Sequence, residues 1–463
     1  MTSDDIMAKL AAIALSGGLL CISIAVRRFV GSWAAPGAVF CLLWFLYTFV
    51  PLVLVFPAPI GLLPILYIVI LLAAFASSTI FFDWRTAMRE NAISSRLPQY
   101  DTKAMRWVFA ASGLLALVFL IANSYRQQIT IGEIFSNIFT SSAQYADRRY
   151  SGAIVDNWFM KLSNLASYMA ASTGGFIYRM KHSKKRQAYV LILSFTPSLF
   201  VMLTQSARGM LFLAMSLFAA AQVVTHLANP GANLIRRGLL ARLMGGVLVI
   251  VPCIVVSFIA KGLYDVQDTA YVGDRLLHAF TSYVSGHLYA FADWFTYYIG
   301  GNPINLYVET PDRANGFYTF MALFKLLGNK TEVPPGVFEE YFTYGGYVTS
   351  NIYTMFRGLI LDFGLIGSVI FMFVSGLVLN ACFYWLLVAR GTVVWVATYV
   401  CAMGYYYTSF IISIMIWNSI FVTFVALCLL LWIDEYLSGR KYMRERRHLA
   451  PSVGNHSRHS RTL

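Results

Sequence analysis

Charged side chains are scarce in this sequence. Only 12% of its 463 residues are Asp, Glu, Lys or Arg, about half the share found in an average soluble domain. Hydrophobic residues make up 58%, which leaves too little polar surface to cover a water-soluble fold. The length alone would allow two or three soluble domains, but this composition excludes them and predicts one integral-membrane domain over residues 1–463.

Metal ligands and disulfide partners are also missing. All six cysteines fall inside long apolar runs, and none forms a Cys-x-x-Cys pair, so we expect them to pack rather than to form a disulfide framework. No outward segment carries a His or Cys pair at ligand spacing, and there is no acidic Asp-x-Asp cluster. We therefore predict no metal site and no cofactor.

Long apolar runs recur along the whole chain. Each of eleven runs is long enough for a helix to cross a bilayer, which takes about 17–25 residues. The sequence therefore predicts an all-α polytopic membrane protein with about eleven transmembrane helices. The predicted spans are 6–26, 33–56, 60–82, 107–123, 159–178, 188–205, 210–227, 243–260, 358–388, 392–412 and 416–432.

Lysine and arginine are unevenly distributed between the connections. If the N-terminus lies outside, the cytoplasmic segments hold 23 of the 35 Lys and Arg residues, including the basic tail 438–463, whereas 15 of the 21 acidic residues lie outside. The positive-inside rule then predicts an N-out and C-in topology with an odd number of spans. The net charge of +14 follows from this topology and favours contact with anionic lipid over nucleic acid.

Two outward connections, 124–158 and 261–357, are too long to be turns, and we expect function to lie there. The second contains an aromatic and apolar stretch with helical spacing, LLHAFTSYVSGHLYAFADWF, from Leu276. We favour an interfacial or re-entrant helix that roofs a cavity. A further span is the alternative, but it would put the neighbouring acidic loop on the wrong side unless a second hidden span restored it.

Ionisable residues are almost absent from the spans and gather at their outer ends. This distribution argues against a secondary transporter or ion pump, which usually buries charge at mid-membrane. Arginine has a planar fork that pairs with phosphate oxygens, so arginines just above the bilayer suit a lipid-linked pyrophosphate. Each alone could instead snorkel to the interface. These arginines are Arg148, Arg149, Arg208, Arg275, Arg313 and Arg357.

Several strings carry a resemblance to a known family. SNIYTMFRGLILDFGLIGSVIFMF, from Ser350, resembles the entry to a late transmembrane helix in bacterial oligosaccharide repeat-unit polymerases, the O-antigen polymerase group. TQSARGMLFL, from Thr204, is similar to their Ser-Arg-Gly turn at an outward helix boundary. Arg275, followed by ten residues and Gly286, matches an Arg-x10-Gly pattern of their outward loops. The resemblance covers about residues 140 to 380.

The resemblance implies a GT-C-like architecture in the bacterial inner membrane and a glycosyltransferase activity at its periplasmic face. Such an enzyme transfers a growing glycan from undecaprenyl pyrophosphate to another lipid-linked repeat unit. The pyrophosphate is already an activated leaving group, so the protein has mainly to align two lipid-anchored substrates and to stabilise charge on the departing phosphate, without a metal. Membrane lipid, a chain-length regulator and a flippase are the implied partners.

The resemblance also suggests roles for individual residues. Arg208, Arg275 and Arg357 are the candidates for binding the pyrophosphate. The candidates for the general base that takes the acceptor hydroxyl proton are His287, Asp293, Glu339 and Asp362. Asp362 could instead hold Arg357 or cap a helix. The remaining candidates for substrate binding are Arg148, Arg149, Arg313, Tyr347, Asn351 and Tyr353.

Two other functions stay open. The related O-antigen ligases carry a His-Asn pair where this sequence has Ser350 and Asn351, and the missing histidine favours a polymerase. A lipid-linked glycan flippase would require a polar cavity through the spans and gives no reason for the 97 residues of segment 261–357.

The predicted topology can be tested with reporter fusions. Alkaline phosphatase folds only outside the cytoplasm, so a fusion after Gly336 is expected to be active and a fusion after Lys185 inactive. The enzyme activity of cells that express each fusion gives the measurement. The reverse pattern would overturn the orientation.

Overall fold

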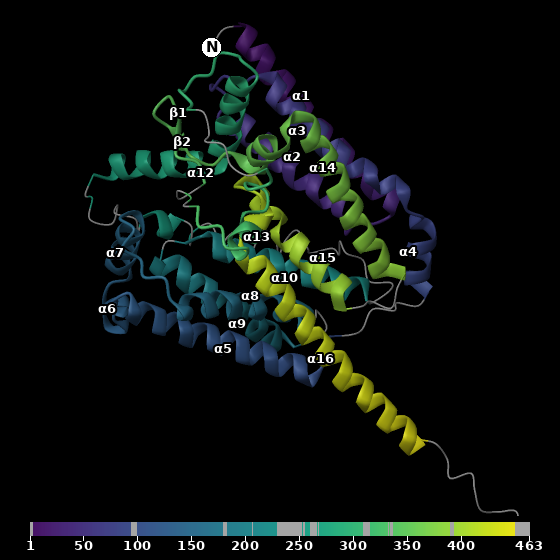
Figure 1. Ribbon diagram of the computed structural model, residues 1–463. Coiled ribbons are helices and arrows are strands. Elements are labelled where there is room, and N and C mark those ends of the chain that lie inside the picture. Colours follow the sequence, from purple (N-terminus) through teal and green to yellow (C-terminus); the bar gives the residue numbers. More distant parts are fainter. Residues whose placement is uncertain are drawn as a thin grey trace, which may run out of the picture.

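The computed structural model describes residues 3–93, 100–178, 183–205, 207–228, 252, 255–259, 266, 268–308, 315–331, 333, 337–388 and 393–449. Within these residues, eight helices are long and apolar enough to cross a membrane, and each coincides with a predicted span. They confirm an all-α, multi-pass membrane protein (Figure 1). The eight are α1 (Ser3–Val30), α2 (Pro36–Leu54), α3 (Leu62–Ser77) with the 3-10 turn η1 (Ser78–Phe81), α5 (Lys103–Arg126), α9 (Lys184–Gln205), α10 (Gly209–Leu227), α14 (Thr354–Val388) and the first part of α16 (Asn418–Leu449).

The other three predicted spans have different outcomes. Helix α8 (Trp158–Ile177) coincides with the run 159–178 but carries several serines and is not among the eight. The run 392–412 does not form one helix, because α15 (Val393–Tyr405) ends after 13 residues and continues as the 3-10 helices η2 (Tyr406–Phe410) and η3 (Ile414–Ile416). Most of the run 243–260 lies outside the described residues.

The long helices form two groups, seen at the upper right and lower left of Figure 1. In one group α1, α2, α3 and α14 pack together, with the short helix α4 (Trp84–Ile93) at one end. In the other group α5, α8, α9 and α10 pack together. Helix α15 contacts α14 of the first group and α10 of the second and so joins them, whereas α16 packs against α15 and against α5 and α8 of the second group.

Small residues allow the closest helix contacts. A side chain at Gly376 of α14 would collide with the Phe75 carbonyl of α3, and one at Gly175 of α8 would collide with the Phe218 carbonyl of α10. Close packing of backbones through small residues is a usual way for helices to associate in lipid, where the hydrophobic effect does not drive them together.

Helix α14 is broken at Gly364, which has a φ of 66°. A residue with a side chain seldom adopts this conformation, so glycine is needed there. Directly after the break, the Leu365 carbonyl accepts a hydrogen bond of 2.9 Å from the Tyr67 hydroxyl of α3.

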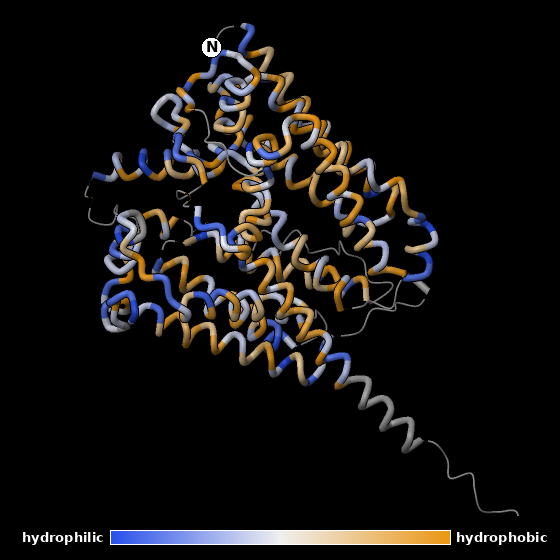
Figure 2. The backbone as a smooth tube through the Cα atoms, in the orientation of Figure 1, coloured by the Kyte–Doolittle hydropathy of each residue, from blue (hydrophilic) through white to orange (hydrophobic). Residues whose placement is uncertain are grey.

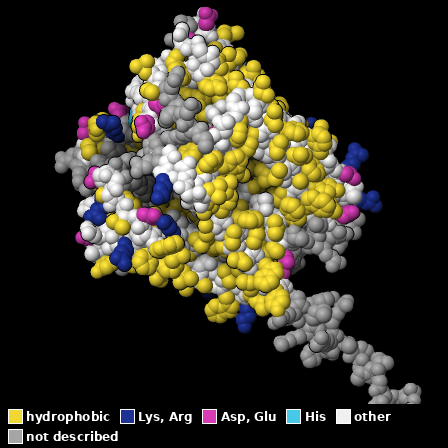
Figure 3. Space-filling view, in the orientation of Figure 1, with side chains coloured by type: hydrophobic (Ala, Val, Ile, Leu, Met, Phe, Trp, Pro, Cys, Tyr) yellow, Lys and Arg dark blue, Asp and Glu magenta, His cyan; other side chains and the backbone are white. Residues whose placement is uncertain are grey.

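A broad apolar surface covers these helices. The hydropathy-coloured tube (Figure 2) and the space-filling view (Figure 3) show hydrophobic residues across the long helices, with charged side chains gathered towards the edges. Among the outward-pointing residues, Leu114 of α5 and Ile366 of α14 are 60% and 79% exposed. So large an exposed apolar surface is stable only against lipid or another protein.

The two long connections lie at the same end of the molecule as the N-terminus, whereas α4 and the end of α16 lie at the opposite end (Figure 1). We call these the outward end and the inner end. This is the arrangement that the predicted topology requires, and which side of the membrane each end faces stays a prediction. The connections contain α6 (Ile131–Ser136), α7 (Ile138–Tyr150), α12 (Thr269–Tyr298), α13 (Met321–Leu326) and a hairpin of β1 (Phe342–Tyr344) and β2 (Val348–Ser350) that pairs Phe342 with Ser350.

Helix α12 organises the outward end. It begins where the Asp268 side chain accepts hydrogen bonds from the backbone of Ala270 and Tyr271, a standard N-cap. Its first half is largely exposed, whereas every residue in 285–295 is buried. Because Gly286 has no side chain, Ser350 of the hairpin can lie directly on the helix. Although it has 30 residues, α12 is not among the eight apolar helices.

Candidate functional site

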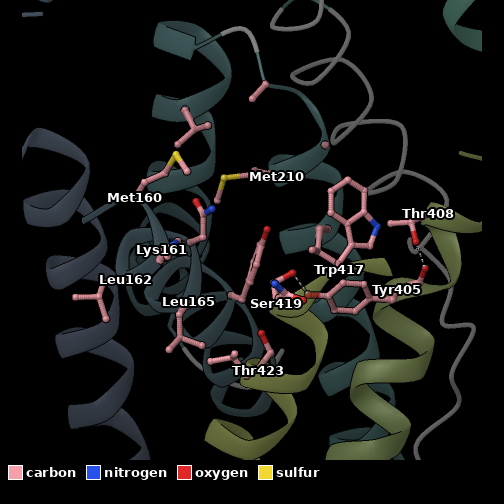
Figure 4. Close-up of a pocket in the computed structure, with 18 of the residues that line it drawn as sticks. Met160, Lys161, Leu162, Leu165, Met210, Tyr405, Thr408, Trp417, Ser419 and Thr423 are labelled. Atoms are coloured by element: carbon pink, nitrogen blue, oxygen red, sulfur yellow. Dashed lines mark hydrogen bonds between the residues drawn. The ribbon is translucent and has the colours of Figure 1, made fainter. Parts of the chain in front are cut away.

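A cavity of about 680 Å³ lies between α8, α10 and α16 near their outward ends. Figure 4 shows side chains of α8, among them Met160, Leu162 and Leu165, on one wall and Tyr405, Trp417 and Thr423 on the opposite wall. Most of the lining is apolar and aromatic, so the cavity suits a long hydrocarbon chain.

Two tryptophans frame the edge of this cavity. Both line the cavity: Trp158 is the first residue of α8 and Trp417 directly precedes α16, and their side chains are 76% and 43% exposed. Tryptophan is enriched at the boundary between bilayer and water. Lys161 also lines the cavity and forms an ion pair of 2.7 Å with Asp156. The cavity therefore has an apolar interior with an amphipathic rim.

Arg208 lies next to the cavity, at the start of α10. The following residue, Gly209, lines the cavity, and its carbonyl accepts a hydrogen bond of 2.6 Å from the Tyr407 hydroxyl. The Arg208 Nε donates to the Ser257 hydroxyl at 3.1 Å. Its guanidinium carbon lies 3.4 Å from the ring centre of Phe258, a cation–π contact. A buried cation thus lies beside the cavity, between Ala207 and Gly209, which line it.

Arg357 lies in different surroundings. It is completely buried at the start of α14, and its Nη2 is 3.2 Å from both carboxylate oxygens of Glu340. The rings of Phe338, Tyr353, Trp294 and Tyr307 surround the guanidinium at 3.8, 4.3, 5.0 and 5.9 Å. A guanidinium that is already paired and enclosed links α14 to the outward loop, and this geometry offers little room for a phosphate.

The three candidate clamp arginines are not brought to one point. Arg275 is exposed and its Nε donates to the Tyr271 hydroxyl on the first turns of α12, whereas the side chains of Arg208 and Arg357 lie against Tyr283 and Trp294 of the same helix. A helix rises 1.5 Å per residue, so Tyr271 and Tyr283 are about 18 Å apart along α12, and Tyr283 and Trp294 are about 16 Å apart. Of the three, only Arg208 adjoins the cavity.

His287 completes a broken helix. Pro51 of α2 has no N–H, so the carbonyl of Tyr47, four residues earlier, lacks its helical partner. The Nε2 of His287 lies 2.9 Å from that carbonyl oxygen, which can only accept, so Nε2 carries the hydrogen. Nδ1 is buried beside the Phe410 ring and has no partner among the described residues. This geometry favours a positioning role over that of a general base.

The carboxylates of the outward end also bind backbone. Asp362 accepts hydrogen bonds from the backbone N–H groups of Tyr318 and Thr319, at 3.2 and 2.6 Å, which fits the alternative of a structural cap. Asp293 accepts four hydrogen bonds from the segment 304–307, one of them from the Tyr307 hydroxyl. Both therefore fix the loop to the helices.

Three of the candidates for substrate binding, Tyr347, Asn351 and Tyr353, lie on or beside the hairpin. Tyr353 is fully buried and donates to the Glu340 carbonyl at 3.0 Å, and burial raises its pKa to about 12, so the hydroxyl stays a donor. It belongs to the surroundings of Arg357. Tyr347 and Asn351 are partly exposed, with Tyr347 against Tyr344 at a ring distance of 5.8 Å.

The arginines of the loops are only partly described. Arg148 of α7 donates to the Gln127 carbonyl and ties α7 to the end of α5. Tyr145, one turn earlier, lines the cavity. The side chain of Arg149 and the whole of Arg313 lie outside the described residues.

Three important residues were not among the sequence candidates. They are Glu340, which pairs with Arg357, Tyr407, which bonds Gly209, and Lys9. Lys9 is a completely buried cation that donates to the Tyr289 hydroxyl at 2.6 Å and to the Val55 carbonyl at 3.3 Å. A lone lysine in the first apolar run is the signal that could have revealed it, because such a charge requires polar partners.

Metal ligands are not clustered in the described part of the chain, where no group of three His, Cys, Asp or Glu residues is placed to hold an ion. No family model matches the sequence, and neither a curated protein nor a solved structure matches the chain. Function is therefore argued from the site itself.

The pairing of Arg357 predicts a large effect of a small change. Glu340→Gln removes the charge partner of a fully buried guanidinium, and we expect the free energy of unfolding to fall by about 3 kcal/mol. Thermal unfolding of the purified protein in detergent gives the measurement. Glu339→Gln is the matched control, because Glu339 is exposed, and it should leave stability nearly unchanged. Equal stability of the two variants would show that Arg357 does not depend on Glu340.

Burial also predicts how stability varies with pH. It lowers the pKa of His287 to about 4, below its usual 6.5, so the unfolded chain binds the proton more readily between these values. Stability from this residue should be present above pH 6.5 and be lost as the pH falls towards 4, by up to about 3 kcal/mol. His287→Gln keeps a donor for Tyr47 but cannot titrate in this range.

The measurement compares thermal unfolding of both proteins between pH 7.5 and pH 4.5. The variant should lose less stability than the wild type as the pH falls. His278→Gln, on the same helix, is the control and should follow the wild type. Parallel curves for the wild type and His287→Gln would contradict a neutral buried histidine.

Proposed function

We propose that this protein joins lipid-linked oligosaccharide repeat units into a long polysaccharide at the outward face of a bacterial inner membrane. The observation that carries the proposal is the apolar cavity of about 680 Å³ with the buried cation of Arg208 beside it. A polyprenyl pyrophosphate has a long hydrocarbon chain, which the cavity could hold, and an anionic head, which could lie next to Arg208.

Arg208 is the residue best placed to act on the pyrophosphate. Its guanidinium is fixed by the Ser257 hydroxyl and the Phe258 ring, and it lies at the N-terminal end of α10, where the helix dipole is also positive. A positive charge that is fixed in advance in an apolar site stabilises negative charge that develops on a leaving phosphate, with little reorganisation. The chain would enter between α8 and α16.

The polar residues of α8 argue against a flippase. The hydroxyls of Ser167, Ser172 and Thr173 each donate to a carbonyl one turn earlier in their own helix. They therefore do not provide free groups along a path for a glycan. A ligase differs from a polymerase only in its acceptor, lipid A core, and the test below separates the two.

The test measures glycan length in a strain that lacks the chromosomal copy of this protein. Arg208→Ala is expected to abolish long chains while single-repeat material remains, with a rate loss of about 100-fold or more. Arg208→Lys should restore part of the activity, because lysine keeps the charge but loses the planar fork. Met210→Trp, which fills the cavity, should also shorten the chains.

Arg126→Ala is the matched control, because Arg126 is exposed at the outward end of α5 and does not line the cavity. It should give wild-type chains, and immunoblots of membranes should show equal protein for all variants. Normal chain length in Arg208→Ala would refute the proposal. Loss of transfer to lipid A core with normal polymer would indicate a ligase, and repeat units held at the inner face would indicate a flippase.

A further inference from the structure

A second cavity lies at the inner end, far from the candidate site. It has a volume of about 250 Å³ and lies between the first turns of α5 and α9 and the end of α8. Three cations line it: Lys103 and Arg106 of α5, and Arg186 of α9. No part of the proposed reaction uses these residues.

One carboxylate holds two of these cations. The Arg106 Nε and the Arg186 Nη2 lie 2.8 and 2.9 Å from the same oxygen, Oδ1 of Asp101. The two guanidinium groups are thus drawn together although their helices are separate in sequence. Lys103 also lines the cavity, so three cations and no carboxylate are among its lining residues. A cationic lining suits a phosphate. The nearby Asp434 of α16 accepts a hydrogen bond from Thr102 and does not line the cavity.

The floor of the cavity is apolar. Phe109, Ile177 and Val190 line it and are no more than 2% exposed. Trp107 and Tyr189 flank it and are 69% and 50% exposed, and the Tyr189 ring lies edge-on to Phe109 at 5.8 Å. Exposed tryptophan and tyrosine beside a basic rim are typical of the depth at which lipid headgroups lie.

We propose that this cavity binds one anionic phospholipid. Its phosphate lies between Arg106 and Arg186, with Lys103 beside it, and one acyl chain runs along the exposed rings of Trp107 and Tyr189. The charge surplus selects an anionic over a zwitterionic headgroup, since each basic residue near an anionic lipid surface contributes about 1 kcal/mol. The exposed rings of Trp107 and Tyr189 select a lipid over a soluble phosphate compound. This binding does not depend on the proposed polymerase activity.

Native mass spectrometry of the full-length protein in detergent tests the proposal. Phosphatidylglycerol, phosphatidylcholine with the same acyl chains, and glycerol 3-phosphate are titrated separately, and the bound fraction gives an apparent Kd. The wild type is expected to bind one phosphatidylglycerol most tightly. Arg106→Gln combined with Arg186→Gln should weaken that binding about tenfold or more and leave phosphatidylcholine unchanged.

Arg85→Gln combined with Arg89→Gln is the matched control. It removes the same charge from exposed positions of α4 at the same end of the molecule, and it should not weaken binding. If the first double variant fails to fold, Lys103→Gln removes one exposed rim cation and should weaken binding about fivefold. Equal affinity for the two lipids, equal losses in test and control variants, or binding of glycerol 3-phosphate as tight as the lipid would each overturn the proposal.

Discussion

The outward end of this protein depends on the carbonyl groups at the broken end of α2. Pro51 leaves the Tyr47 carbonyl without a helical donor, and the helix ends three residues later at Leu54, with Val55 as the next carbonyl. Such groups are costly in apolar surroundings. Donors from other helices satisfy them: His287 bonds Tyr47, while Tyr289 and Lys9 bond Val55. The buried half of α12 is therefore held in place by hydrogen bonds to carbonyl groups at the end of α2 that lack a helical donor.

Once α12 is fixed, it positions the remaining parts of the outward end. Trp294 packs against Arg357, whose pair with Glu340 holds the chain that leads into the hairpin. Asp293 binds the backbone of the segment 304–307. At the other end of its buried half, Tyr283 lies 5.8 Å from the guanidinium of Arg208. One helix thus separates a paired, structural arginine from an arginine beside the cavity.

Hydropathy predicted eight of the spans because about twenty consecutive apolar residues have few other uses in a protein. It could not predict the end of α15, since tertiary hydrogen bonds from Trp44 to Ser409 and from Tyr47 to the Tyr407 carbonyl accompany the change to 3-10 helix. The same limit applied to the site. Hydropathy predicts how deep each arginine lies in the membrane, but depth carries no information about lateral position, so Arg208 and Arg357 were expected together.

The arginines of this protein differ chiefly in the carboxylates around them. A buried arginine with one carboxylate of its own, as in the pair of Arg357 and Glu340, is neutral as a unit, and it stabilises the fold without attracting a further anion. Asp101 is shared by two arginines, and a lysine lines the same cavity, so the cations there outnumber the carboxylate that they share. Position at a membrane boundary does not distinguish these cases, whereas the ratio of cations to carboxylates does. That ratio can be determined only from the folded structure, because Arg186 and Asp101 are 85 residues apart in sequence.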